Sequence, residues 1–198
     1  MPRQRLRTWT LLVLAAATLG ALGLSRAAPS TSTSTATSTS GQLSKAVERG
    51  GYLVKAGGCG DCHSPKIPSE VGLVPDSTRL LSGHPSLPRL PPAPRIDGGP
   101  WIVVGLATGT AWAGPWGTSF SSNLTPDKDT GMGRWIDRLF IDAMRTGRHM
   151  GQGRLILPPM PVQAIGQFND EDLSSIFAYL QSLPAIRNFV PDPLAAPE

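Results

Sequence analysis

Apolar residues recur at helical spacing in three segments of the chain, at about residues 42–56, 135–146 and 170–183. The apolar face of the first segment consists of Leu43, Ala46, Val47, Gly50 and Val54. The third segment is preceded by the capping residue Asn169 and followed by Pro184, which ends a helix. We find no convincing strand ladder and no internal repeat. The pattern predicts an all-α fold of three or more helices.

Residues 64–131 lack the helical pattern and are rich in proline and glycine. The chain holds 22 glycines and 20 prolines, and this region includes a proline-rich run at 88–94. Three of the five tryptophans, Trp101, Trp112 and Trp116, also lie here. A loop of this length is uncommon in an isolated compact fold, but it is expected when the loop wraps a large apolar object. Only 6% of the residues are aromatic, so such an object would also fill a core with few large side chains.

The N-terminus has the layout of an export signal. Arg3, Arg5 and Arg7 precede an apolar run at residues 9–24, and small residues follow at the expected cleavage site. The run has 16 residues, which as a helix is about 24 Å long, whereas a membrane span usually needs about 20 residues. We therefore expect residues 1–27 to be a signal peptide of a periplasmic or otherwise exported protein. A retained N-terminal anchor, tethering the protein to the membrane, is the alternative.

A Ser/Thr-rich stretch follows, and residues 28–42 are expected to form a disordered linker. The formal charge of +4 comes from the export segment, because residues 1–27 hold four of the 18 Lys and Arg and none of the 14 Asp and Glu. The remaining chain is balanced, with 14 basic and 14 acidic residues. It has no cluster of basic residues that would contact phosphates, so we expect no nucleic-acid partner.

The two cysteines define the candidate chemistry. Cys59 and Cys62, followed at once by His63, form a C-x-x-C-H sequence, the signature of c-type haem attachment. Two thiols at this spacing can each bond one vinyl group of the porphyrin, and the next residue then offers its imidazole to the iron. A single motif predicts one covalently attached haem c. Covalent attachment suits an exported protein, because it retains a cofactor that would otherwise be lost.

Two other interpretations of this motif are open. A thioredoxin-like redox pair has the same cysteine spacing but expects a βαβ neighbourhood, whereas the flanks here are a helix and a Gly/Pro-rich loop. A zinc site would need a fourth ligand, for which His84 and His149 are the candidates. A haem also accounts for the composition, since a macrocycle can replace missing aromatic core.

His63 would supply one axial ligand, and the residues leave several candidates for the other. Met160 lies in a proline-rich strap at 157–161, which is held extended and can present a thioether at low entropic cost. Met160 could instead be a flexible core residue. Met144 fits the buried face of a helix, and Met132 lies unsupported between two glycines. The remaining candidates are Met150 and His149, in a Gly-rich turn, and His84, in an expected surface turn.

Several segments together resemble class I-type c-type cytochromes. The closer resemblance is to the single-haem cytochromes and cytochrome subunits related to bacterial alcohol and gluconate dehydrogenases. The matching segments are 49–53 before the C-x-x-C-H motif, then 123–127, 130–135, 157–161, 169–173 and 176–180. Many relatives carry two or three haem motifs, whereas this chain carries one.

The resemblance covers about residues 43–190, which we expect to be one cytochrome c domain followed by a tail at 191–198. It implies a cytochrome c-like fold around one haem, with long Gly/Pro-rich loops. It also implies that Met160 is the distal iron ligand and that the first and third helices cross near Gly51 and Tyr179.

The motif and the resemblance predict an exported one-electron carrier that is not itself an enzyme. Iron held by His63 and Met160 has no open position for a substrate, and donor and acceptor redox proteins would dock weakly. One alternative is the electron-accepting cytochrome subunit of a membrane-associated or periplasmic dehydrogenase complex. Another is a gas sensor or peroxidase whose sixth ligand is labile.

The Trp-rich segment and the segment at Asn123 each have two possible interpretations. The Trp-rich segment 101–120 is expected to pack over the haem edge, with a docking surface for a partner or a quinone as the alternative. Asn123, Leu124 and Thr125 match a glycosylation acceptor, but Pro126 follows and the resemblance places the segment inside the fold. We therefore expect no modification there.

Overall fold

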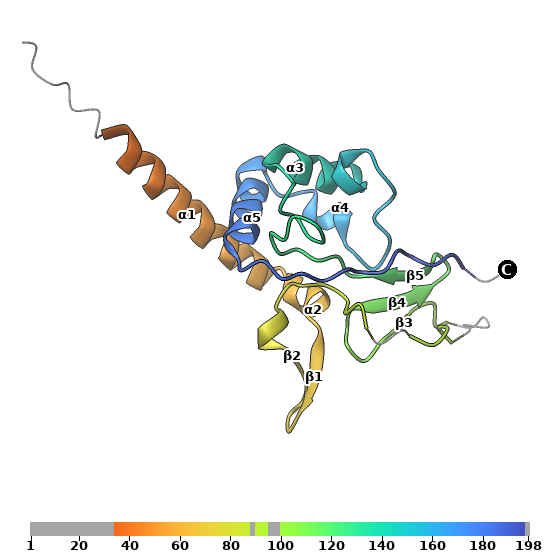
Figure 1. Ribbon diagram of the computed structural model, residues 1–198. Helices are drawn as coiled ribbons and strands as arrows, with labels where there is room; N and C mark the ends of the chain where they lie inside the picture. The colour runs from red at the N-terminus through yellow and green to blue at the C-terminus, as the bar shows by residue number, and fades with distance from the viewer. Residues whose placement is uncertain (1–33, 88–89, 95–99, 197–198) are drawn as a thin grey trace, which may run out of the picture.

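Figure 1 shows a computed structural model of the chain, which describes residues 34–87, 90–94 and 100–196. The expected signal peptide at 1–27 and residues 28–33 of the expected linker lie outside the described residues. The helices of the described part are α1 (Ser34–Ala56), α2 (Cys59–His63), α3 (Asp137–Thr146), α4 (Val162–Ile165) and α5 (Asp170–Ser182), with 3₁₀ turns at Ser77–Arg79 and His149–Gly151. The predicted all-α, cytochrome c-like fold class is confirmed in that the described part is mostly helical, although it also contains two small sheets. Over these residues, no helix combines the length and apolar character that a membrane crossing requires.

The three predicted helices are present, with small differences at their ends. The helix predicted at 135–146 begins at Asp137, and the helix predicted at 170–183 ends at Ser182. The side chain of Asn169 caps α5 as predicted, accepting a hydrogen bond from the backbone N–H of Asp172 at 2.7 Å. The local sequence signals therefore define both ends of α5.

The first helix is longer than its apolar pattern indicated. α1 begins at Ser34 rather than at about Gln42, so part of the expected linker is helical. Serine and threonine are weak helix formers, but a helix that packing has already nucleated extends at one hydrogen bond per residue without a second nucleation cost. The N-terminal part of α1 projects away from the body of the molecule, and its C-terminal part lies against α5 (Figure 1).

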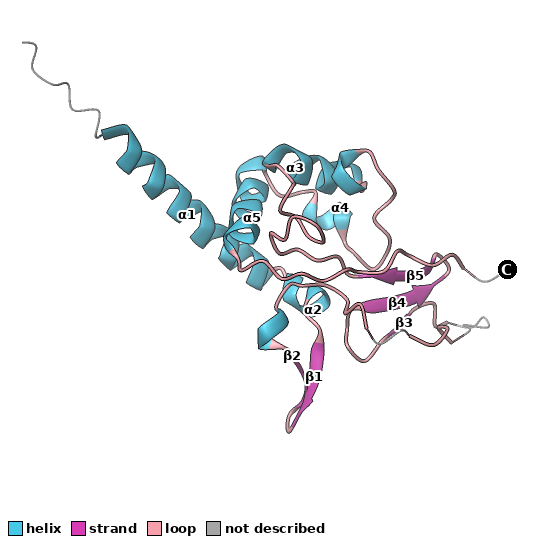
Figure 2. Cartoon of the chain, in the orientation of Figure 1, coloured by secondary structure: helices cyan, strands magenta, loops and turns pink. Residues whose placement is uncertain are grey.

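The expectation of no strands was wrong, because residues 64–131 contain two small antiparallel sheets (Figure 2). One sheet consists of β1 (Lys66–Ser69) and β2 (Gly72–Pro75). The other, in spatial order, consists of β3 (Val104–Gly105), β4 (Ala111–Gly114) and β5 (Gly117–Phe120). Strands of two to four residues are too short to show the alternation by which a strand is recognised in a sequence.

One hydrophobic core joins α1, α3 and α5. Val54 of α1, Phe140 of α3 and Leu173 of α5 are buried in it, and the rings of Phe140 and Phe177 stack with their centroids 5.7 Å apart. Burying each large apolar side chain of this kind contributes about 1.5–3 kcal/mol. The core therefore holds the three long helices as one unit.

α1 and α5 cross where glycines remove side-chain bulk. A Cβ atom at Gly51 would lie 3.0 Å from the ring of Tyr179, so the predicted crossing near these two residues is confirmed. Beside the crossing, Nε and Nη2 of Arg49 donate to the carboxylate of Asp172 at 2.8 and 3.3 Å. The crossing fixes the end of α1 that leads into α2, and so fixes the position of the C-x-x-C-H motif.

The chain after α5 runs back across the molecule to the sheet of β3, β4 and β5 (Figure 1). Leu194 pairs with Thr118 of β5 through two backbone hydrogen bonds of 2.9 Å. Asn188, with 4% of its surface exposed, is buried along the way. The described part of the expected tail at 191–198 is thus joined to the sheet at Leu194.

Candidate haem site

The C-x-x-C-H motif occupies one short helix. α2 begins directly after Gly58, whose φ of 66° is the left-handed conformation that glycine adopts without strain, so the chain turns sharply between α1 and α2. Cys59 and Cys62 are both free and half-buried. Because they stand three residues apart on a helix, their side chains lie on neighbouring positions of one face.

His63 is held in the orientation and tautomer that a metal ligand needs. It is 7% exposed, and its Nδ1 lies 2.8 Å from the backbone carbonyl oxygen of Ser122. A carbonyl can only accept, so Nδ1 carries the proton and Nε2 keeps a free lone pair. Burial lowers the pKa of His63, which also favours the neutral, ligating form.

The thiols do not resemble those of a redox-active pair. Burial raises the pKa of Cys59, and burial together with the nearby Asp61 carboxylate raises the pKa of Cys62. Catalytic C-x-x-C pairs need a lowered thiol pKa, because the thiolate is the attacking form. The thioredoxin-like interpretation therefore lacks its main physical requirement.

A zinc site also lacks support among the described residues. They contain no group of three or more His, Cys, Asp or Glu side chains placed to hold a metal ion. Of the two candidate fourth ligands, His84 bonds through Nδ1 to the Thr110 hydroxyl at 2.9 Å. His149 packs edge-on against Trp135, with their ring centroids 5.0 Å apart. Both side chains are thus engaged away from the cysteines.

Met160 lies in a strap that is fixed at both ends. It is half-buried and, like Cys59, packs against the main hydrophobic core. The Ser119 hydroxyl of β5 donates to the carbonyl of Pro158 at 2.5 Å. After Met160, the N–H of Val162 donates to the Met160 carbonyl at 2.9 Å, and α4 begins there. These contacts hold the strap without engaging the thioether.

One extended segment contacts both the His63 ring and the strap that carries Met160. Ser119 bonds the strap two residues before Met160, and Ser122, three residues further along, bonds the His63 ring. Three extended residues span about 10 Å. The residues present therefore fit a c-type haem: Cys59, Cys62 and His63 would hold it from α2, and the strap would offer the thioether of Met160.

Two of the other candidate ligands differ from expectation. Met132 is not unsupported but buried, with 5% exposed, because Gly131 and Gly133 allow the turn to pack against the backbone carbonyls of Thr125 and Pro126. His84 is not in a surface turn but is 3% exposed. Local sequence could not reveal either burial, since the covering atoms come from elsewhere in the chain.

Met144 and Met150, the other candidate methionine ligands, lie in different surroundings. Met144 is 8% exposed within the core, as its helical spacing predicted. Met150 lies in the 3₁₀ turn at His149–Gly151 with a φ of 52°. None of these side chains is presented by a strap comparable with that of Met160.

The Trp-rich segment does not behave as one unit. Trp101 is 80% exposed, whereas Trp112 in β4 and Trp116 in the turn between β4 and β5 are half-buried. Trp116 donates through Nε1 to the Ser119 hydroxyl at 3.3 Å, and so supports the residue that holds the strap.

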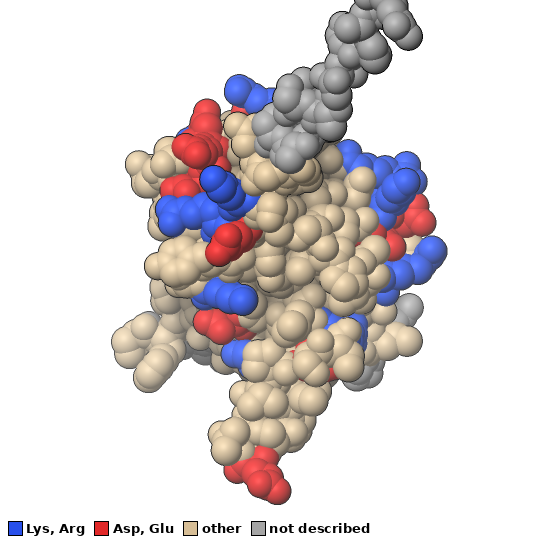
Figure 3. Space-filling view, turned by 90° about the vertical axis from the view of Figure 1, so that its left-hand side faces the viewer, with Lys and Arg blue, Asp and Glu red and all other residues tan. Residues whose placement is uncertain are grey.

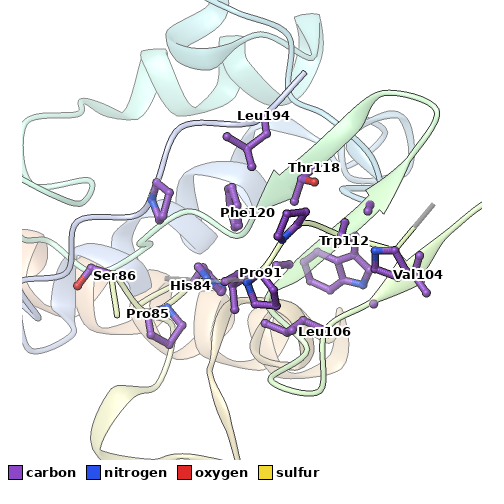
Figure 4. Close-up of a pocket in the computed structure, with 18 residues that line it drawn as sticks. His84, Pro85, Ser86, Pro91, Val104, Leu106, Trp112, Thr118, Phe120 and Leu194 are labelled. Carbon is purple, nitrogen blue, oxygen red and sulfur yellow. The ribbon is translucent and has the colours of Figure 1, made fainter. Parts of the chain in front are cut away.

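A cavity of about 590 Å³, which the sequence did not reveal, lies beside the sheet of β3, β4 and β5 (Figure 4). Side chains alternate along β5, so Ser119 faces the strap while Thr118 and Phe120 face the cavity. The walls are mostly apolar and include Leu106, Ala111 and the proline-rich segment at 91–94. His84 lines it with its ring centroid 4.9 Å from that of Phe120, and burial lowers the pKa of His84.

Asn123 is part of the internal hydrogen-bond network. It is 3% exposed, its Nδ2 donates to the Ile186 carbonyl at 2.7 Å, and its Oδ1 accepts from the Thr125 hydroxyl at 2.7 Å. The expectation that this segment lies inside the fold is therefore confirmed. The glycosylation-like sequence serves to tie β5 to the chain after α5.

Comparison with known proteins identifies relatives among bacterial dehydrogenase subunits and c-type cytochromes. The chain is 31% identical over 145 residues to a subunit of nicotinate dehydrogenase from Pseudomonas putida, covering 73% of this chain and 9% of that protein. It is 32% identical over 133 residues to the gluconate 2-dehydrogenase cytochrome c subunit of Pantoea cypripedii, covering 67% and 22%. It is also 31% identical over 153 residues to a diheme cytochrome c-type protein of Cereibacter sphaeroides, covering 74% and 38%. No family model matches the chain.

The fold and these relatives together support a place for this chain in the cytochrome c family. Within that family, the relatives include cytochrome subunits of bacterial dehydrogenases. The chain spans less than a quarter of the length of the first two relatives. Their similarity supports an electron-transfer cytochrome related to components of dehydrogenase complexes.

Proposed function

We propose that the protein is an exported mono-haem c-type cytochrome that carries one electron at a time. Cys59 and Cys62 would hold the haem by thioether bonds, and His63 and Met160 would be its axial ligands. The observation that carries this proposal is the His63 ring, which is buried on the C-x-x-C-H helix with Nδ1 at 2.8 Å from the Ser122 carbonyl. This bond places the proton on Nδ1 and leaves the lone pair on Nε2. When bound, the haem supplies an iron that alternates between ferrous and ferric states.

The residues of this chain would hold the cofactor and would perform no bond-making chemistry on a substrate. With His63 and Met160 both bound to it, the iron would be closed to substrates, and a methionine ligand together with histidine would raise its reduction potential. No residue in this proposal acts as a general acid, general base or nucleophile. The gas sensor or peroxidase alternative requires Met160 to leave the iron, which the two-point anchoring of the strap disfavours.

The second candidate function is that of a cytochrome subunit accepting electrons from a dehydrogenase. The relatives named as gluconate, fructose and quinone-linked alcohol dehydrogenase cytochrome subunits favour it. Charge on the face shown in Figure 3 is mixed, with basic and acidic groups around a broad uncharged area. This face suits a protein partner better than a polyanion, and docking would not depend on one dominant charge.

The first experiment tests haem attachment. The full chain is expressed in a host with a c-type cytochrome maturation system, and acid–acetone extraction is followed by intact mass measurement. We expect one haem to remain with the polypeptide, and the Cys59→Ser/Cys62→Ser double variant to hold none covalently. Extractable haem or a colourless product from the unchanged sequence would contradict the proposal.

The second experiment distinguishes an independent electron carrier from a subunit of a dehydrogenase complex. The protein is purified from its native membranes and soluble fraction under mild conditions, and its molar mass is measured by light scattering. A monomer that exchanges electrons with several redox proteins supports the carrier. A stable complex with a dehydrogenase of defined stoichiometry supports the subunit. The same preparation shows by N-terminal sequencing whether residues 1–27 are cleaved.

A further inference from the structure

His63 is held at two points, and neither partner lies in a helix. Its ring donates to the carbonyl of Ser122 at 2.8 Å, and its own backbone carbonyl accepts from the N–H of Gly83 at 2.8 Å. Ser122 follows β5, and Gly83 belongs to the loop after the 3₁₀ turn at Ser77–Arg79. The orientation of the imidazole therefore depends on what fixes these two loops.

The two loops are packed main chain against main chain. A Cβ atom at Gly83 would lie only 2.5 Å from the carbonyl oxygen of Ser121 and 2.6 Å from the carbonyl carbon of Ser122. Gly83 has a φ of 78°, which side chains rarely tolerate, and the N–H of His84 donates to the Ser121 carbonyl at 2.8 Å. Any displacement of the loop at Gly83 is thus transmitted to the carbonyl that orients His63.

A single buried amide fixes that loop from the far end of the chain. Nδ2 of Asn188 donates to the carbonyls of Ser82 and His84 at 2.7 and 2.8 Å, one on each side of Gly83. Its Oδ1 accepts from Arg79 at 3.2 Å and from the N–H of Ser86 at 3.3 Å. Both N–H groups and both lone pairs of the amide are used. Asn188, Ser82 and His84 are all buried, with 4%, 0% and 3% of their surfaces exposed.

We infer that Asn188 is a positioning residue for the iron ligand His63, acting through the Gly83 loop and the Ser122 carbonyl. This inference rests on the proposed function. A strong hydrogen bond from Nδ1 to Ser122 makes the imidazole more basic and favours ferric iron. Loosening the loop weakens that bond, so the reduction potential rises. Asn188 touches neither the ring nor the haem ligands, and it acts only by placing the groups that do.

The test uses Asn188→Leu, which removes all four hydrogen bonds at similar volume and without a change of charge. Two quantities are measured on the purified holoprotein: the midpoint potential, and the hyperfine-shifted proton resonances of the His63 ring in the ferric form. We expect the potential to rise and the ring resonances to move. Asn169→Ala is the matched control, because it removes another asparagine side chain that stabilises the fold, at the cap of α5.

A potential and ring resonances unchanged in Asn188→Leu, or shifted equally in Asn169→Ala, would overturn the inference. If Asn188→Leu gives no folded holoprotein, Arg79→Lys decides. It keeps the charge but weakens the bond to Oδ1 of Asn188, and we expect a smaller shift of the potential in the same direction. No shift in Arg79→Lys then counts against the inference.

The proposed function and the role of Asn188 can be rejected separately. If the unchanged protein carries no covalent haem, both the proposed function and this inference are rejected. If it carries haem with histidine and methionine ligation but the variants behave like the control, only the role of Asn188 is rejected.

Discussion

Gly50 of α1 lies directly against the backbone carbonyl of Ser175 in α5, and the two helices leave no room for a Cβ atom between them. The neighbouring Gly51 lies against the ring of Tyr179. This close approach sets the angle and depth at which α1 enters the fold. Because α2 follows α1 after a two-residue turn at 57–58, the same contact also positions the cysteines.

We predict that Gly50→Ala destabilises the protein. The added methyl group must push α1 away from α5, and overpacking of this kind typically costs about 1–3 kcal/mol. The free energy of unfolding is measured by guanidinium titration of the holoprotein, and haem yield reports whether α2 is still presented for attachment.

Gly41→Ala is the matched control, because Gly41 lies in the same helix with no atom within 4 Å of an added Cβ. Alanine is the better helix former by about 1 kcal/mol, so this variant should be neutral or stabilised. Equal effects of the two substitutions would mean that helix propensity, and not the contact with Ser175, governs position 50.

Sequence alone predicted the parts of the site that depend on adjacent residues. The motif from Cys59 to His63 and the cap of α5 at Asn169 are local, and their signals are strong. Met160 was predicted as a ligand from its prolines and the family resemblance, and this role stays a prediction. The partners of these residues were not predictable, because Ser119, Ser122 and Asn188 are ordinary polar residues whose roles arise only when distant segments meet.

The strands and the burial of Met132 and His84 were not predictable because they also depend on contacts between distant segments. β1 to β5 are too short for a periodic signal, and their pairing is stabilised by the loops and the C-terminal segment around them. Because glycine or proline residues adjoin them, Met132 was predicted to be unsupported and His84 to lie in a surface turn. Their burial instead depends on contacts with Thr125 and Thr110, which are not adjacent to them in the sequence. Start and stop signals also could not reveal how far α1 extends beyond its packed part.

Replacement of Met160 tests the distal ligand. In Met160→Ala we expect loss of the sulfur-to-iron charge-transfer band at the red edge of the ferric spectrum, high-spin iron and a lower reduction potential. Met144→Leu is the control, because Met144 is a buried core residue and leucine has a similar volume. A ferric spectrum that is unchanged in Met160→Ala would reject the assignment of this residue.

The ion pair between Arg49 and Asp172 predicts a pH dependence of stability. The hydrogen bond from Arg49 lowers the pKa of Asp172 below its usual value of 3.8. A lowered pKa in the folded state stabilises the fold above the unfolded value, and the contribution is lost as the pH falls through the folded value. Unfolding free energies measured from pH 6 down to about pH 2 should therefore decline below about pH 4, and less steeply in Arg49→Gln.

The matched variant for this prediction is Asp172→Asn, which removes the titrating group itself. It should show the same reduced pH dependence as Arg49→Gln, and the double variant should show no further reduction, because the two side chains form one pair. About 1 M salt should also weaken the dependence, since screening acts over about 3 Å at that concentration. A full pH dependence in Arg49→Gln would assign the effect to other carboxylates.

Ser119 is a buried residue, 7% exposed, whose hydroxyl donates to the Pro158 carbonyl in the Met160 strap. Ser119→Ala leaves this carbonyl without its donor, which costs about 1–3 kcal/mol where no water replaces it. A weaker anchor lets the strap open more often, so an external ligand such as imidazole should displace Met160 more readily. Each 1.4 kcal/mol lost from the closed strap corresponds to about a tenfold tighter apparent binding of imidazole to the ferric protein.

Optical titration with imidazole measures this effect, and Thr118→Val is the control. Thr118 lies next to Ser119 on β5 but faces the cavity on the other side of the sheet, and valine has nearly the same shape as threonine. Ser119→Ala should bind imidazole more tightly than the unchanged protein, and Thr118→Val should not. Equal affinity in all three proteins would show that the strap is held by its prolines and by the start of α4, and that the hydrogen bond from β5 contributes nothing to closing the iron.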